Sequence, residues 1–227
     1  MVELSRVWHV LSESVEEKRR FFRPDFGKDY VPGMEPTTIS KYALNIMLDL
    51  KPGDVAMTPL GEAKFKAHAA DQFGSTCLPF GTPLATMLSE VQKIVQAPGE
   101  MVIMHELDGM SRQIYMDGRK LPVDPNPSWL GYSTGRWEGD TLVVETTGLN
   151  DRVPLDLFGH PRSEAMHLTE RYRRRDIGHL DVEYTFDDPK MYSKPFTVRL
   201  THLLQPDTDI LEYVCNENEK DRAHIAR

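Results

Sequence analysis

The chain has 227 residues, of which 40% are hydrophobic and 27% charged, a balance that indicates a folded globular protein and excludes a disordered one. Its formal net charge is −8 at pH 7. A surface of that sign repels phosphate backbones, so we expect no nucleic-acid partner. We expect no membrane partner either, because no stretch approaches the roughly 18 apolar residues that cross a bilayer.

Residues 1–87 are predicted to form a partly helical, proline-rich extension. Apolar residues recur at helical spacing in 5–22 and 38–50, and a third short helix is expected to begin at Pro59. Prolines and Pro-Gly pairs interrupt these segments too often for a tidy helical bundle. We therefore expect arms and short helices that lie on a sheet or on another subunit, and a homo-oligomer assembled through this extension.

Residues 88–216 are predicted to be a mainly β domain, followed by a C-terminal tail at 217–227. Tight turns separate short segments in which apolar and polar residues alternate. Nine strands are expected, at 91–96, 101–107, 112–116, 130–137, 141–147, 164–174, 180–186, 196–204 and 210–215. This pattern favours an antiparallel, lipocalin-like barrel or a strongly curved sheet, whose interior is just large enough for one small ligand.

Three smaller features complete the outline. The basic run from Arg171 to Arg175 is expected to be a solvated strand end or a salt-bridging surface. The two cysteines, Cys77 and Cys215, allow at most one disulfide, and their spacing does not suggest a metal site, so buried free thiols are expected. The N-terminus lacks a continuous apolar segment typical of a signal peptide, which predicts a cytoplasmic location, with an exported mature form as the alternative.

An ordered series of motifs between about residues 55 and 220 resembles a large bacterial family. The motifs are MTPLGEA at 57–63, CLP at 77–79, DGR at 117–119, GRWEGDTLVVETTGLND at 135–151, HPRSEAMHLTER at 160–171, Asp188-Pro189 with Tyr192, and EYVC at 212–215. Members are mostly labelled hypothetical and many look exported, so this resemblance implies membership and no particular activity.

The chain is also similar, in general likeness rather than by a catalytic motif, to the cofactor-independent γ-formaldehyde lyases of bacterial lignin-dimer (phenylcoumaran-type) catabolism. That likeness implies a retro-aldol-type loss of formaldehyde from a phenylpropanoid dimer, with a phenol such as that of Tyr184 assisting.

Candidate site residues are polar side chains on the apolar face of a predicted strand, because that face turns inward. Six are expected to converge: Glu106, Arg112, Glu170, Tyr184, His202 and Glu212. A buried carboxylate needs a partner or a raised pKa, and either suits acid–base chemistry in a dry interior. An internal salt bridge or a solvent-facing strand end is the alternative explanation for each residue.

Roles follow from these residue types. Glu170 or His202 is predicted to remove a proton, and Tyr184 with Arg112 to steady the developing negative charge. The predicted substrate site also includes Glu106, Tyr172, Glu212 and His167. Strict alternation puts His167 opposite Glu170, so the two can share a site only if a bulge intervenes.

We expect neither a metal nor another cofactor, since no pair of histidines has ligand spacing on one strand face and no glycine-rich loop precedes a helix. Three functions are consistent with the sequence. The first is a cofactor-independent lyase or isomerase that acts on a small aromatic, lignin-derived phenolic molecule. The second is a non-catalytic binding protein for a small hydrophobic molecule. The third is a structural protein that assembles through its N-terminal arm.

Overall fold

The computed structural model describes residues 3–10, 41–51, 53–68, 78–88 and 90–215. The elements in chain order are β1 Val7–Val10, α2 Lys41–Leu44, α3 Pro59–His68, α4 Leu84–Met87, β2 Gln92–Ala97, β3 Glu100–His105, the 3₁₀ turn η2 Leu107–Gly109, β4 Ser111–Tyr115, β5 Tyr132–Glu138, β6 Thr141–Thr147, β7 His167–Arg174, β8 His179–Asp187 and β9 Phe196–Leu204.

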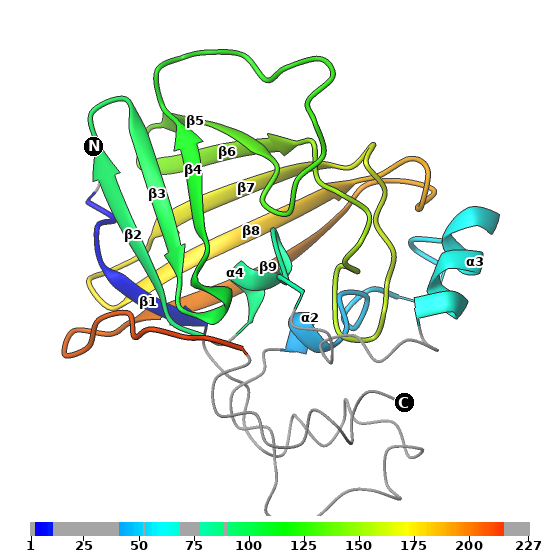
Figure 1. Ribbon diagram of the computed structural model, residues 1–227, viewed down its shortest axis with the longest axis horizontal. Helices are drawn as coiled ribbons and strands as arrows, with labels where there is room; N and C mark the ends of the chain where they lie inside the picture. Colours follow the sequence, from blue (N-terminus) through cyan, green and yellow to red (C-terminus); the bar gives the residue numbers. More distant parts are fainter. Residues whose placement is uncertain (1–2, 11–40, 52, 69–77, 89, 216–227) are drawn as a thin grey trace, which may run out of the picture.

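Nine strands form one closed sheet in which each strand pairs with its neighbours in sequence (Figure 1). The ring closes because β1 pairs with both β2 and β9. Small domains with many short alternating strands bury one face of each strand in this way, and closure removes the unpaired edges. The chain is therefore mainly β, as the alternation predicts.

One pairing corrects the expectation of a wholly antiparallel sheet. Strand β5 runs parallel to β4, with Ile114 opposite Ser133 and Tyr115 opposite Thr134. Parallel neighbours require a long crossover connection, and residues 116–131 supply it. The sequence prediction assumed strands joined mostly by tight turns and had no signal for the direction in which the chain returns after this long connection.

Two predicted elements are wrong. Residues 210–215 do not form a strand. Strand β9 already pairs with β8 on one side and β1 on the other, so a tenth strand would have no edge to join. Val7–Val10 is a strand rather than the start of a helix. The prediction failed because a short apolar segment fits both the helical period of 3.6 residues and the strand period of two. The rest of that predicted helix lies outside the described residues.

Other elements agree with the sequence more closely. Strands β6 and β9 have the predicted bounds, and the helix expected at Pro59 is α3. Within the described residues 41–50, the helix expected over 38–50 is limited to α2, which is followed by turns at residues 46–49. The inward residues of the strands join side chains from α2 and α4 in one apolar core, so these two short helices pack against the ring.

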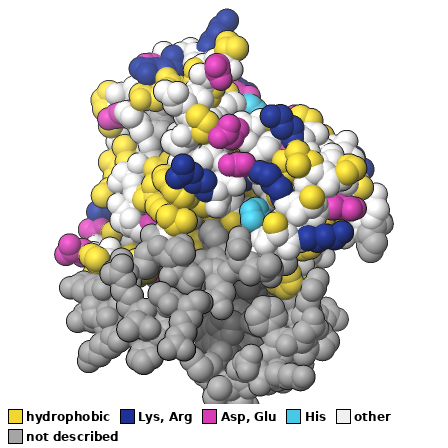
Figure 2. Space-filling model, turned by 45° about the vertical axis from the view of Figure 1, so that its right-hand side comes forward, with side chains coloured by type: hydrophobic (Ala, Val, Ile, Leu, Met, Phe, Trp, Pro, Cys, Tyr) yellow, Lys and Arg dark blue, Asp and Glu magenta, His cyan; other side chains and the backbone are white. Residues whose placement is uncertain are grey.

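The basic run on β7 forms surface ion pairs, as predicted. Arg171 binds Glu138 at 2.9 Å, and Arg173 lies 3.6 Å from Asp140. On the face shown in Figure 2, basic and acidic side chains are interspersed. Such exposed pairs contribute little to stability individually, because water screens them.

Gly61 in α3 fixes the helix against the segment that follows β8. A Cβ atom at this position would lie 2.4 Å from the carbonyl oxygen of Met191, which is backbone and cannot move aside cheaply. Alanine normally favours a helix over glycine by about 1 kcal/mol. We predict that Gly61→Ala nevertheless lowers the melting temperature, whereas Glu62→Ala on the exposed side of the same helix leaves it nearly unchanged. A rise in the melting temperature of Gly61→Ala would contradict this packing.

Candidate functional site

A continuous belt of polar side chains lines the inside of the ring. Each strand from β2 to β9 contributes at least one member, and every member is at least nine-tenths buried. The belt consists of Gln92, His105, Arg112, Ser133, Thr146, Glu170, Tyr172, Tyr184 and His202. Because an unpaired polar group in an apolar interior is costly, such a belt must be satisfied by internal contacts or by a bound molecule.

Arg112 and Glu170 form the centre of the belt. The guanidinium binds both carboxylate oxygens, with Nη1 3.0 Å from Oε1 and Nη2 against Oε2. Its remaining donors reach the hydroxyls of Thr146 at 2.7 Å and Ser133 at 3.1 Å. Burial by itself lowers the pKa of Arg112, but the charge of Glu170 and its hydrogen bond, with smaller contributions from Tyr172 and Tyr184, together raise that pKa above its ordinary value. This pair is a charged, fully buried ion pair.

The carboxylate of Glu170 is already well occupied. Besides Arg112, it accepts a hydrogen bond at 2.8 Å from the hydroxyl of Tyr172. A carboxylate whose two oxygens already accept from three donors has little lone-pair capacity left for a substrate proton. Glu170 therefore fits the role of a counter-charge to Arg112 better than the predicted role of proton acceptor.

His202 lies between Gln92 and Tyr184. Its Nδ1 atom is 2.6 Å from the side-chain amide of Gln92, and its Nε2 atom is 3.5 Å from the hydroxyl of Tyr184. Burial, then the charge of Glu170, raise the pKa of Tyr184 well above its ordinary value, so this phenol stays protonated and is a hydrogen-bond donor. The contact to Tyr184 is long for a hydrogen bond, which leaves both groups weakly engaged with each other.

His105 and Gln92 are directly opposite each other on β3 and β2. Neither ring nitrogen of His105, nor Oε1 of Gln92, has a hydrogen-bond partner among the described residues. Burial, and secondarily the charge of Arg112, lower the pKa of His105 to about 3. The imidazole is therefore neutral near pH 7 and presents one donor and one acceptor.

The lowered pKa of His105 predicts a pH-dependent stability. The unfolded chain binds a proton at this histidine below pH ~6.5, whereas the folded chain binds it only near the depressed value of about 3. The contribution of His105 to the unfolding free energy is therefore complete above pH ~6.5 and is lost as the pH falls from there, by at most about 1.4 kcal/mol per unit. Urea unfolding of the wild type and His105→Gln at pH 7, 6 and 5 measures it. Equal pH slopes for the two proteins would contradict the prediction.

The structure brings Arg112, Glu170, Tyr172, Tyr184 and His202 together, but the predicted convergence of Glu106 and Glu212 with them is wrong. On β3 the inward residues are Met101, Ile103 and His105, so the inward face was assigned one residue out of register. Glu106 follows β3 and accepts a hydrogen bond from the backbone of Leu211 at 2.8 Å. Glu212 is exposed on the segment that forms no strand.

His167 is also outside the belt. It begins β7 and is only partly buried, on the face opposite Leu168 and Glu170. The register of β7 with β6 and β8 is continuous, so no bulge turns His167 inward. The same alternation rule, counted from Met101 instead of Val102, would have placed His105 inside the ring.

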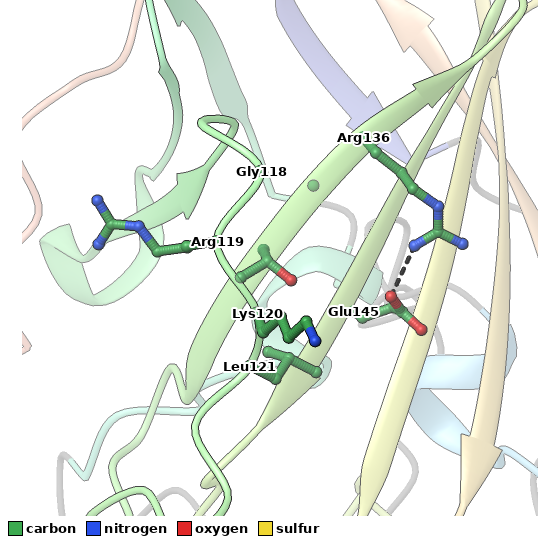
Figure 3. A pocket seen from close by; sticks show the side chains of 8 residues that line it. Gly118, Arg119, Lys120, Leu121, Arg136 and Glu145 are labelled. Atoms are coloured by element: carbon green, nitrogen blue, oxygen red, sulfur yellow. Dashed lines mark hydrogen bonds and ion pairs between the residues drawn. The ribbon is translucent and has the colours of Figure 1, made fainter.

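A separate pocket of about 260 Å³ lies on the outside of the ring, where the β4–β5 connection crosses β5 and β6 (Figure 3). Lys120 and Leu121 lie on one side of it and Arg136 and Glu145 on the other. Arg136 and Glu145 neutralise each other in an ion pair at 2.6 Å. The pocket shares no residue with the belt, so the pocket and the belt are independent features.

Within the described ranges, no group of three or more His, Cys, Asp or Glu side chains has an arrangement that could hold a metal ion. No helix in these ranges is long and apolar enough to cross a membrane. Cys215 is disulfide-bonded, which corrects the expectation of free thiols.

Comparison of the chain with protein-family models and with curated proteins found no match. The family resemblance and the lyase likeness seen in the sequence motifs therefore stay predictions.

Proposed function

We propose that the protein is a cofactor-independent lyase that takes a small, mainly aromatic molecule into its lipocalin-like ring and cleaves it by acid–base chemistry. The observation that carries the proposal is the buried contact between Tyr184 and His202, at 3.5 Å from hydroxyl to Nε2. A ligand hydroxyl held by both groups would meet a proton acceptor and a hydrogen-bond donor at the same oxygen.

The roles of the residues follow from their contacts. Gln92 determines which nitrogen of His202 carries the proton, because it binds Nδ1. The amide nitrogen of Gln92 faces Nδ1 and donates to it, which leaves the imidazole proton on Nε2. After a half-turn, the amide oxygen of Gln92 accepts a proton from Nδ1, and Nε2 becomes the basic nitrogen that the reaction requires. His202 is then the base, Tyr184 the donor and Gln92 a positioning residue.

The proposed reaction is a retro-aldol-type cleavage. His202 removes the proton of a primary hydroxyl, the carbon–carbon bond next to the carbinol carbon breaks, and that carbon leaves as formaldehyde. The electron pair left on the adjacent carbon takes up a proton or expels a leaving group. Arg112 and Glu170 keep the interior polar and fix the hydroxyls of Ser133, Thr146 and Tyr172 around it.

A non-catalytic binding protein is the second candidate. It is favoured by the saturation of Glu170, since Arg112 and Tyr172 already occupy the carboxylate that was the other predicted base. In this case, the same belt orients an apolar ligand and no bond is broken. The third function, a structural protein that oligomerises through the N-terminal extension, depends largely on residues outside the described ranges.

A ligand panel separates the three functions. The melting temperature is measured against phenolic dimers, monophenols, steroids and fatty acids, and formaldehyde is assayed in every well. Stabilisation by a phenolic that also releases formaldehyde is the expected result. Stabilisation with the ligand recovered unchanged would support the binding protein instead, and no stabilisation by any compound would contradict both of these functions.

The disulfide at Cys215 bears on the compartment in which this chemistry occurs. Disulfides persist in oxidising compartments and are rare in the cytosol. This bond favours an exported protein over the cytoplasmic location expected from the sequence.

A further inference from the structure

The belt has two parts that differ in hydrogen bonding. At its centre, the donors of Arg112 are matched by Glu170, Ser133 and Thr146. On β2 and β3, His105 and Gln92 lie opposite each other and carry the unpartnered Oε1, Nδ1 and Nε2 atoms. Among the belt residues, the unpartnered atoms therefore gather at one place on the inner wall.

Their chemistry is specific. His105 is 3% and Gln92 2% exposed, so bulk water does not satisfy either group. The imidazole of His105 is neutral, and a neutral imidazole offers one donor and one acceptor. Gln92 adds an acceptor through Oε1, or a donor if its amide makes a half-turn. A hydroxyl group matches either orientation, because it both donates and accepts.

A carboxylate fits the position between His105 and Gln92 poorly. It accepts hydrogen bonds but cannot donate them, so it would leave acceptors at this position unpaired. Arg112 is the nearby cation, and its charge is already neutralised by Glu170. The position offers no net positive charge to offset the cost of bringing a second anion into the interior.

Gln92 connects this position with the proposed reacting pair. The same side-chain amide that carries the unpartnered Oε1 binds Nδ1 of His202. We infer that His105 and Gln92 form a subsite for an uncharged hydroxyl, so that the substrate is a neutral aromatic molecule with a second hydroxyl besides the one that meets Tyr184 and His202. This inference rests on the proposed interior site and defines the class of molecule that it accepts.

Three small probes test the subsite by isothermal titration. They are 3-phenylpropane-1,2-diol, 3-phenylpropan-1-ol, which lacks one hydroxyl, and 3-phenyllactate, in which a carboxylate replaces the hydroxymethyl group of the diol. We expect the diol to bind the wild type roughly 10-fold more tightly than the mono-alcohol, because the mono-alcohol leaves buried polar groups unpaired. We expect 3-phenyllactate to bind more weakly than the diol.

Variants connect the preference to the subsite. In His105→Leu the advantage of the diol over the mono-alcohol is expected to disappear, while the mono-alcohol still binds. His105→Gln retains both a donor and an acceptor and is expected to keep part of the preference, so a folding failure of the leucine variant leaves the test intact. His167→Leu is the control, because His167 lies outside the belt, and it is expected to bind all three probes like the wild type.

The outcomes distinguish the subsite from the function on which it rests. Equal affinity of the wild type for the diol and the mono-alcohol would overturn the subsite, with a buried water as the partner of His105, and would leave the interior site standing. Binding of none of the probes would overturn the interior site, and the subsite with it. A diol preference that His105→Leu retains would also overturn the subsite.

Discussion

Replacing Glu170 by glutamine is expected to lower the unfolding free energy by about 3–5 kcal/mol, because the variant leaves the buried guanidinium of Arg112 without a counter-charge. Both side chains are at least 99% buried, and the guanidinium binds the carboxylate through two nitrogens. The glutamine side chain has nearly the same shape as that of glutamate, so the loss of stability comes from the missing charge rather than from poorer packing. Urea unfolding monitored by tryptophan fluorescence measures it.

Two further variants separate the buried pair from ordinary surface charge. Glu183 binds Arg199 at 2.5 Å, but the side chain of Arg199 is 75% exposed, so Glu183→Gln is expected to change the unfolding free energy by about 1 kcal/mol or less. The double substitution Arg112→Met with Glu170→Met removes both charges together and is expected to be far less destabilising than Glu170→Gln. Equal losses for Glu170→Gln and Glu183→Gln would show that the Arg112–Glu170 pair is not desolvated.

Replacing Tyr184 by phenylalanine is expected to reduce turnover by roughly 10²- to 10⁴-fold, the range in which a positioned proton donor or acceptor contributes. The substitution removes one hydroxyl and keeps the aromatic ring in the core. Formaldehyde release from the best substrate of the ligand panel measures the rate, and titration with the same compound measures its binding. We expect the rate to fall much further than the affinity.

Tyr192→Phe is the matched control for this variant. Tyr192 is as buried as a core residue, and its hydroxyl donates to the carbonyl oxygen of Pro161 at 2.7 Å, away from the belt. Its loss is expected to affect stability without a comparable effect on turnover. If Tyr184→Phe and Tyr192→Phe reduce turnover equally, Tyr184 has only a structural role and the lyase proposal loses the contact on which it depends.

The strands were predictable where alternation was sharp, and less so elsewhere. Phe196–Leu204 was located to the residue because polar and apolar residues alternate along most of its length, and Thr141–Thr147 because the turn at residues 138–140 marks where it begins. Residues 101–104 are all apolar (Met-Val-Ile-Met), so the sequence does not show which alternate residues of this strand face inward. For this reason, Glu106 rather than His105 was expected inside. The direction of β5 depends on the path of a long connection and has no local signature.

The candidate site was predictable in its charged and aromatic members but not in its smaller ones. Glu170, Arg112, Tyr184 and His202 stood out as polar residues on apolar faces. Ser133 and Thr146 did not, because such residues are common in strands and their role appears only through their contacts with Arg112. The unpartnered atoms of Gln92 and His105 depend on the register of β2 with β3, which no sequence pattern specifies.

The measurement that tests the interior site most directly is side-chain nitrogen NMR of the ¹⁵N-histidine-labelled protein, with His105→Gln and His202→Gln used to assign the signals. At pH 7 we expect His105 to show the spectrum of a neutral imidazole, and the ring signals of both His105 and His202 to shift when 3-phenylpropane-1,2-diol is added. A protonated His105, or binding of the diol that moves neither ring, would contradict a ligand site built on this belt.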